Sequence, residues 1–264
     1  MQIVVGSVEG IRVPANDVFA PEDGIAMKDQ ANDIPQQRTA RMAGIFYLAY
    51  LILYPIAATI QGKRINWNNA TATAGAIATS QEMFRAGVAM ELVAALLFLL
   101  AAWALYSLLK NVDRDLALLF LVLNATGVAI ECVGAMMHYA ALTLSTGASW
   151  ITGMKPDELQ ALALIFLKVS ASSSLVDVLF YGAWVIPLGY LVIQSRFLPK
   201  VLGILLICDG VALMICFVQL WLLPGHEKWT YPLYPVMLAA EAGLALWLLI
   251  KGVKVREAMP AIAA

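Results

Sequence analysis

Charged side chains are scarce in this sequence, since Asp, Glu, Lys and Arg together make up only 13% of its 264 residues. An average soluble domain carries about 25%. The formal net charge of −1 also leaves the chain without the basic field that attracts nucleic acid. Hydrophobic residues reach 61%, and the mean hydropathy is +0.79. One soluble core cannot bury so much apolar sequence, so the composition predicts a chain that lies largely in lipid.

Side chains that carry metal or redox chemistry are few. The two histidines, His138 and His226, lie far apart in the sequence, and the three cysteines have no CxxC spacing. We interpret these cysteines as small packing residues inside apolar runs. They are Cys132, Cys208 and Cys216. A zinc enzyme needs several ligands of defined geometry, so we expect no metal and no cofactor.

Motifs for catalysis or nucleotide binding are missing as well. The triplet 172–174 is three serines, but it lies in no nucleophile elbow and has no histidine near it in the sequence. The sequence therefore assigns no catalytic residue.

The first 37 residues lack the apolar core of a cleaved signal peptide. They contain three prolines, Pro14, Pro21 and Pro35, and six acidic residues. This composition predicts a disordered tail over 1–37, a membrane domain over 38–256 and a short tail over 257–264. Met27 lies shortly before the membrane domain, and a start at Met27 rather than Met1 is a hypothesis that follows from this.

Six apolar segments are long enough to cross a bilayer whose hydrocarbon core is about 30 Å thick. They cover residues 42–60, 86–109, 116–144, 170–193, 201–223 and 231–250. The sequence thus predicts an all-α polytopic transmembrane helix bundle with about six spans. The apolar run from 159 to 194 is too long for one ordinary span, so we expect its first turns to lie at the interface or outside. We interpret residues 61–82 as a polar loop.

Lysine and arginine are unevenly distributed between the two sides of these spans. Nine lie on the side of the N-terminus and five on the other side. Because cytoplasmic flanks are richer in these residues, the bias predicts both termini inside. The lipid bilayer is then the one certain partner, nucleic acid is not expected, and the oligomeric state is not determined.

Each of the second to sixth spans contains one acid. These acids are Glu91, Glu131, Asp177, Asp209 and Glu241. A charged side chain near the bilayer centre costs about 2.5–3.5 kcal/mol on an insertion scale, so we expect them to face the bundle interior or water.

Polar residues recur at helical spacing around these acids. On the third span the stripe is Asn124, Gly127, Glu131, Gly134 and His138, and similar stripes contain Asp177 and Asp209. Counting from the span ends places all the acids except Asp209 in the outer half of the bilayer. Gly127 and Gly134 are expected to leave space beside Glu131 for a ligand or water.

The stripes predict an outward-facing cavity that binds or transports a small solute or protons. The candidate ligand- or proton-binding residues are Glu91, Asn124, Glu131, His138, Asp177 and Glu241, with Lys168, Asp209 and Gln219 as secondary candidates. Three alternatives stay open. The polar groups could be packing devices between helices. The protein could be a membrane sensor or a partner-binding scaffold. It could also be an intramembrane enzyme that uses the outer carboxylates with His138.

Several short motifs resemble those of a known family. They include Arg38-Thr-Ala-Arg41, Leu188-Gly-Tyr-Leu191 and Phe197-Leu-Pro-Lys200. With these, the chain from Arg38 to Gly252 resembles the bacterial membrane proteins called domain of unknown function 4386. The resemblance implies a multi-pass protein of the bacterial cytoplasmic (inner) membrane. The resemblance implies no activity, because the matching residues determine membrane topology or helix packing.

Overall fold

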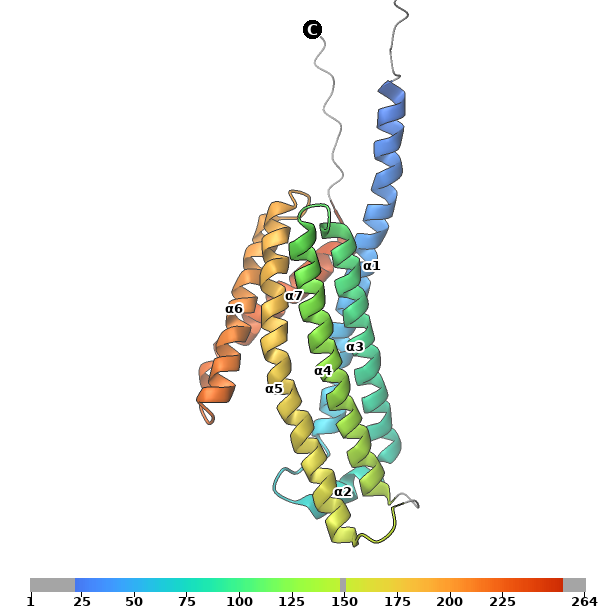
Figure 1. Cartoon of the computed structure of the whole chain (residues 1–264), viewed down its shortest axis with the longest axis vertical. Helices are drawn as coiled ribbons and strands as arrows, with labels where there is room; N and C mark the ends of the chain where they lie inside the picture. The colour runs from blue at the N-terminus through green and yellow to red at the C-terminus, as the bar shows by residue number, and fades with distance from the viewer. Residues whose placement is uncertain (1–21, 148–150, 254–264) are drawn as a thin grey trace, which may run out of the picture.

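The computed structural model describes residues 22–147 and 151–253, and in these ranges the chain forms helices and no strand (Figure 1). The helices are α1 (Glu22–Gly62), α2 (Ala70–Thr79), α3 (Gln81–Leu109), α4 (Arg114–Thr146), α5 (Pro156–Gln194), α6 (Lys200–Leu222) and α7 (Tyr234–Ile250). The 3₁₀ turns η1 (Glu227–Trp229) and η2 (Tyr231–Leu233) join α6 to α7. Six helical segments are long and apolar enough to cross a membrane, namely α1, α3, α4, α5, α6 and α7 together with η2, which confirms the predicted all-α, six-span class.

The start of α1 and the end of α7 lie at the same end of the bundle, together with the α3–α4 and α5–α6 connections (Figure 1). We call this the terminal end. The opposite end, which we call the α2 end, holds α2 and the α4–α5 connection. An even number of spans puts both chain ends on one side. Which side is cytoplasmic stays a prediction.

Two helices differ in extent from the segments read in the sequence. α1 begins at Glu22, inside the expected tail; residues 1–21 and 254–264 lie outside the described residues. α5 is one helix of 39 residues, or roughly 58 Å, so the turns from 156 to 169 continue the span beyond the hydrocarbon core. Glu158 accepts a bond from the backbone N–H of Lys155 at 2.9 Å and caps its first turn.

The predicted loop 61–82 contains a helix that the sequence did not reveal. Asn69 caps α2, because its side-chain oxygen accepts a bond from the backbone N–H of Ala72 at 2.9 Å. The helix packs its buried Thr73 and Ile77 against the α2-end turns of the bundle. Its ten residues are too few to span a bilayer, and this shortness hid it from a search for spans.

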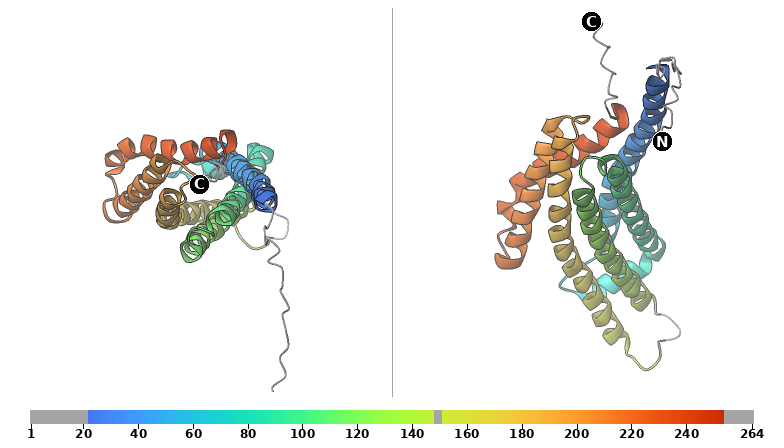
Figure 2. Two further views of the ribbon diagram at one scale, coloured as in Figure 1. Left: turned by 90° about the horizontal axis from the view of Figure 1, so that it is seen from above. Right: turned by 45° about the horizontal axis from the view of Figure 1, so that its top comes forward.

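Glycines bring α5 and α6 into backbone contact near the terminal end. A Cβ on Gly203 would lie 2.6 Å from the carbonyl oxygen of Gly189, and one on Gly189 would lie 2.7 Å from that of Gly203. Toward the α2 end, α6 and α7 lean away from the other spans (Figures 1 and 2). The α2-end half of the bundle interior is therefore formed by α1, α3, α4 and α5.

The centre of the bundle is aromatic. The ring of Phe98 stacks on Tyr50, with centroids 4.0 Å apart and planes 5° apart. Tyr181 and Trp184 meet the same ring edge-on at 5.3 and 5.2 Å. This packing fixes the tyrosine rings of α1 and α5 against α3.

Candidate functional site

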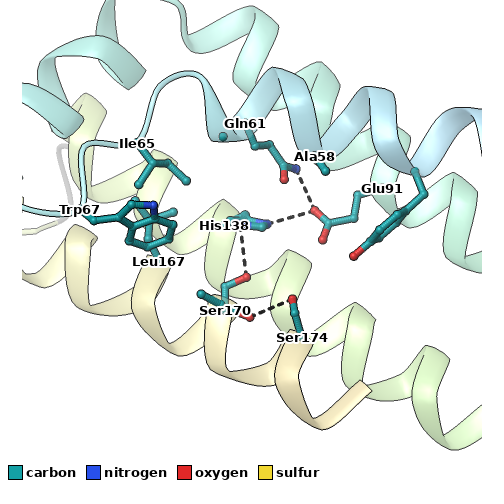
Figure 3. Close-up of a pocket in the computed structure, with 12 residues that line it drawn as sticks. Ala58, Gln61, Ile65, Trp67, Glu91, His138, Leu167, Ser170 and Ser174 are labelled. Carbon is teal, nitrogen blue, oxygen red and sulfur yellow. Dashed lines mark hydrogen bonds and ion pairs between the residues drawn. The ribbon is translucent and has the colours of Figure 1, made fainter. Parts of the chain in front are cut away.

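A cavity of about 170 Å³ lies between α1, α3, α4 and α5 toward the α2 end (Figure 3). We call it the α2-end pocket. Its walls include Gln61, Glu91, His138, Ser170 and Trp67. Five lining residues are exposed: Ala58 and Gly62 of α1, Ala171 and Ser174 of α5, and Trp67 in the loop after α1. The mouth of the pocket therefore lies between these two helices and that loop.

Four helices each contribute one side chain to a hydrogen-bonded chain in this pocket. Gln61 of α1 donates its amide N–H to Oε2 of Glu91 on α3 at 2.8 Å. Nδ1 of His138 on α4 lies 3.0 Å from the same carboxylate oxygen, and its Nε2 lies 3.2 Å from the Ser170 hydroxyl on α5 (Figure 3). Both contacts of the carboxylate involve Oε2, which leaves Oε1 available to a ligand.

Gly134 allows α4 and α5 to approach each other beside this chain. A Cβ there would lie 2.7 Å from Oγ of Ser173 and 3.4 Å from Oγ of Ser170. The space that the sequence assigned to a ligand is thus filled by serine hydroxyls. That expectation was wrong, because the facing helix supplies side chains that sequence spacing does not show.

A second polar cluster lies deeper in the bundle and is centred on Glu131. The Tyr181 hydroxyl donates to Oε2 of Glu131 at 2.5 Å. Asp177 and Glu91 both lie within electrostatic range of this carboxylate. A Cβ on Gly127 would meet the Tyr181 ring at 2.5 Å, so this glycine accommodates Tyr181 and leaves no open space for a ligand.

A third cluster joins Asp209 of α6 to Glu241 of α7. The two carboxyl groups interact electrostatically, and Tyr47 of α1 lies within electrostatic range of both. Asp209 is fully buried, and neither of its carboxyl oxygens has a hydrogen-bond partner in the described chain. Counting along the sequence separated Asp209 from Glu241, whereas the packing of α6 against α7 brings them together.

Three tyrosines on one face of α1 lie within electrostatic range of acids in the three clusters. Tyr47, Tyr50 and Tyr54 are spaced by three and four residues, which aligns them along a helix. Tyr54 lines the α2-end pocket and lies within electrostatic range of Glu91 and Glu131. Tyr50 is in range of Glu131 and Glu241. Sequence reasoning missed this ladder, although its spacing within an aliphatic span was a readable signal.

The other candidates lie outside these three clusters. Lys168 is exposed and does not line the pocket. Gln219 donates to the backbone oxygen of Leu223 at 3.2 Å and secures the end of α6. Asn124 is fully buried, and both atoms of its amide group lack a hydrogen-bond partner among the residues described. In the same residues no group of three His, Cys, Asp or Glu side chains is placed to hold a metal ion.

The family model for the domain of unknown function DUF4386 matches residues 42–252, most of the chain. This chain belongs to the DUF4386 family. No curated protein and no solved structure matches it. The match covers all six spans of this DUF4386 protein and therefore supports the architecture, while the roles of its polar clusters rest on their geometry alone.

Proposed function

We propose that this DUF4386 protein transfers protons through its bundle, between the α2-end pocket and the Asp209–Glu241 cluster. We place it in the cytoplasmic membrane of a bacterium, with the α2 end outside. The observation that carries the proposal is the tyrosine ladder of α1, whose hydroxyls lie within electrostatic range of all three groups of intramembrane acids. Ionisable side chains inside a bundle are costly, and proton relays are among their best-attested roles.

The α2-end pocket supplies the entry step. His138 can accept a proton at one ring nitrogen and donate one from the other, and Glu91 beside it can hold a proton. Tyr54 lines the same pocket and is within electrostatic range of Glu91 and of Glu131. Glu131, which lies deeper in the bundle, can therefore accept a proton that was taken up in the pocket.

The middle of the path contains buried polar atoms that the protein does not satisfy. Oε1 of Glu131 and Oδ1 of Asp177 are buried and have no hydrogen-bond partner in the described chain. Buried polar atoms are as a rule hydrogen-bonded to protein or to ordered water. Water molecules bound at these oxygens would connect the Glu131 cluster to Tyr50 and then to Glu241.

A second candidate function is binding of a small cationic solute in the α2-end pocket. Glu91 offers its free Oε1 there, and the aromatic rings of Tyr54 and Trp67 line the same pocket. A carboxylate with aromatic faces is the usual environment of a bound ammonium group. Saturable binding of an amine, lost in Glu91→Gln, would favour this function.

Proton flux into liposomes tests the first proposal. Purified protein is reconstituted with a pH-sensitive dye inside, and a potassium gradient with valinomycin drives proton entry. We expect Glu131→Gln to abolish the protein-dependent flux, because the amide cannot exchange the proton that a carboxyl group carries. Glu82→Gln is the matched control, since Glu82 is an exposed acid whose ion-pair partner among the described residues is Arg85, at 3.4 Å.

The two variants together decide the outcome. Flux that persists in a well-folded Glu131→Gln protein would remove the proposal, and so would a wild-type protein that conducts no more than empty liposomes. Loss of flux in Glu131→Gln, with wild-type flux in Glu82→Gln, would support it.

A further inference from the structure

Glu91, His138 and Ser170 form a carboxylate–imidazole–hydroxyl series. Oε2 of Glu91 lies 3.0 Å from Nδ1 of His138, and Nε2 of His138 lies 3.2 Å from Oγ of Ser170. A nucleophile, a base in contact with it and a third group that orients the base are the parts of an acyl-transfer site. We propose that Ser170 is a catalytic nucleophile that His138 activates and that its substrate is a carboxylic ester.

The hydroxyl of Ser170 differs from those of the neighbouring serines. Ser172 donates to the backbone oxygen of Lys168 at 3.0 Å, and Ser173 and Ser174 donate to that of Ser170 at 2.8 and 3.3 Å. Such bonds to the preceding turn are the usual arrangement of serine in a membrane helix. The Ser170 hydroxyl instead reaches across to α4, where His138 is its partner.

The carboxylate selects the tautomer that catalysis requires. An ionised Glu91 can only accept hydrogen bonds, so the neutral imidazole donates its Nδ1 proton to it. The lone pair of Nε2 then faces the Ser170 hydroxyl. Gln61 donates to the same carboxylate oxygen at 2.8 Å and holds it in place. Glu91 and Gln61 are thus positioning residues for His138.

The pocket also provides space for a substrate and donors for its oxygen. Ser170 lines the cavity of about 170 Å³, which accommodates a short acyl group. Gln61 and Trp67 line the same cavity, and the second amide proton of Gln61 and the indole N–H of Trp67 form no hydrogen bond within the part of the chain that the structure describes. An ester carbonyl that gains negative charge in the transition state needs such donors.

The depth of the mouth indicates how an ester reaches Ser170. The spanning part of α1 has 27 residues and covers roughly 40 Å, against a hydrocarbon core of about 30 Å. Ala58 lies about 6 Å from the end of α1 at Gly62, so the mouth lies near the boundary of the hydrocarbon. Ester groups of glycerolipids lie at this level, and small esters from the water also reach it.

The proposed reaction has two balanced steps. Oγ of Ser170 bonds to the acyl carbon while its proton moves to Nε2 of His138. That proton then passes to the alkoxide oxygen as the acyl–oxygen bond breaks, which releases an alcohol. In the second step water attacks the acyl-serine and gives its proton to His138. The carboxylic acid then leaves, and Ser170 regains its proton.

A fluorophosphonate probe tests the nucleophile on the full chain in lipid nanodiscs. Attack by Ser170 forms an oxygen–phosphorus bond, expels fluoride and adds a mass that peptide mapping can assign. We expect labelling at Ser170 that approaches one probe per protein and is abolished in Ser170→Ala. His138→Gln should slow it by at least about 100-fold, the usual contribution of a general base. The matched control is Ser172→Ala, which removes an exposed hydroxyl of the same helix and should label as the wild type does.

Two esters distinguish the source of the substrate. Turnover of p-nitrophenyl acetate would indicate a soluble ester, and release of fatty acid from phosphatidylcholine in the nanodisc would indicate a lipid. Either activity must disappear in Ser170→Ala. The proposal is overturned if neither ester is turned over, if Ser170 stays unlabelled, or if labelling is equally fast in a monodisperse His138→Gln protein.

Labelling and proton flux, measured on the same wild-type preparation, separate this proposal from the proton path. That path runs through Glu131, which accepts a bond from Tyr181 and belongs to a deeper cluster than the Ser170 series. Labelling without proton flux in the wild type would support the nucleophile and remove the proton path, whereas flux without labelling would do the reverse.

Discussion

Nδ1 of His138 lies 3.0 Å from Oε2 of Glu91, although 47 residues separate the two in the chain. The pair joins α4 to α3 in a largely buried site, where an unpaired charge would be costly. Gln61 and Ser170 extend it to α1 and α5. These three contacts together join four helices around the α2-end pocket.

Removing His138 should destabilise the bundle. In His138→Leu the Glu91 carboxylate and the Ser170 hydroxyl lose a partner in a largely buried site, which costs about 1–3 kcal/mol for each stranded group. Thermal unfolding in detergent measures the change. His226→Leu is the control, because His226 lies in the exposed α6–α7 connection and should leave the unfolding temperature nearly unchanged.

The contact between Tyr181 and Glu131 should appear as a coupling energy. Tyr181→Phe and Glu131→Leu each remove one partner of a 2.5 Å hydrogen bond, and the double variant removes both. We expect the double variant to be more stable than additivity predicts by about 1 kcal/mol. The reason is that the second substitution leaves no further buried polar group without a hydrogen-bond partner. Strict additivity of the unfolding free energies would show that the bond contributes nothing.

The close approach of α5 and α6 should depend on Gly203. In Gly203→Ala the new methyl group meets backbone atoms, the oxygen of Gly189 at 2.6 Å and the nitrogen of Ile193 at 2.9 Å, which cannot rotate away. We expect a loss of about 1–3 kcal/mol in unfolding free energy. Gly243→Ala is its matched control, since a Cβ there meets only a Leu202 methyl at 3.6 Å. Equal stability of the two variants would contradict the helix packing described here.

The orientation of the bundle can be tested with two matched asparagines in a background without native cysteines. Asn68 precedes α2, Asn111 lies between α3 and α4, and both are exposed. With the α2 end outside, a membrane-impermeant maleimide should label Asn68→Cys in intact cells and Asn111→Cys only after the membrane is opened. The opposite labelling pattern would show that the terminal end is outside and would contradict the predicted orientation.

Local hydropathy was enough to predict the spans, because the transfer of a helix into lipid depends on the roughly 20 residues within it. The cost of a charge in lipid predicted that all five acids avoid lipid; four of them are buried and Glu241 is partly buried. The short helix α2 was missed, since its ten residues are stabilised by a cap and by packing on the bundle.

By itself, then, the sequence determined that this chain is a six-span helical protein whose spans carry acids and polar stripes. Tertiary structure alone decided which of these groups meet. It placed Ser170 opposite His138, filled the space at Gly127 with Tyr181, and paired Asp209 with Glu241. The physical reason is that helical periodicity is local to one helix. Contacts between helices depend on where two backbones can approach, and that is settled by side chains far apart in the chain.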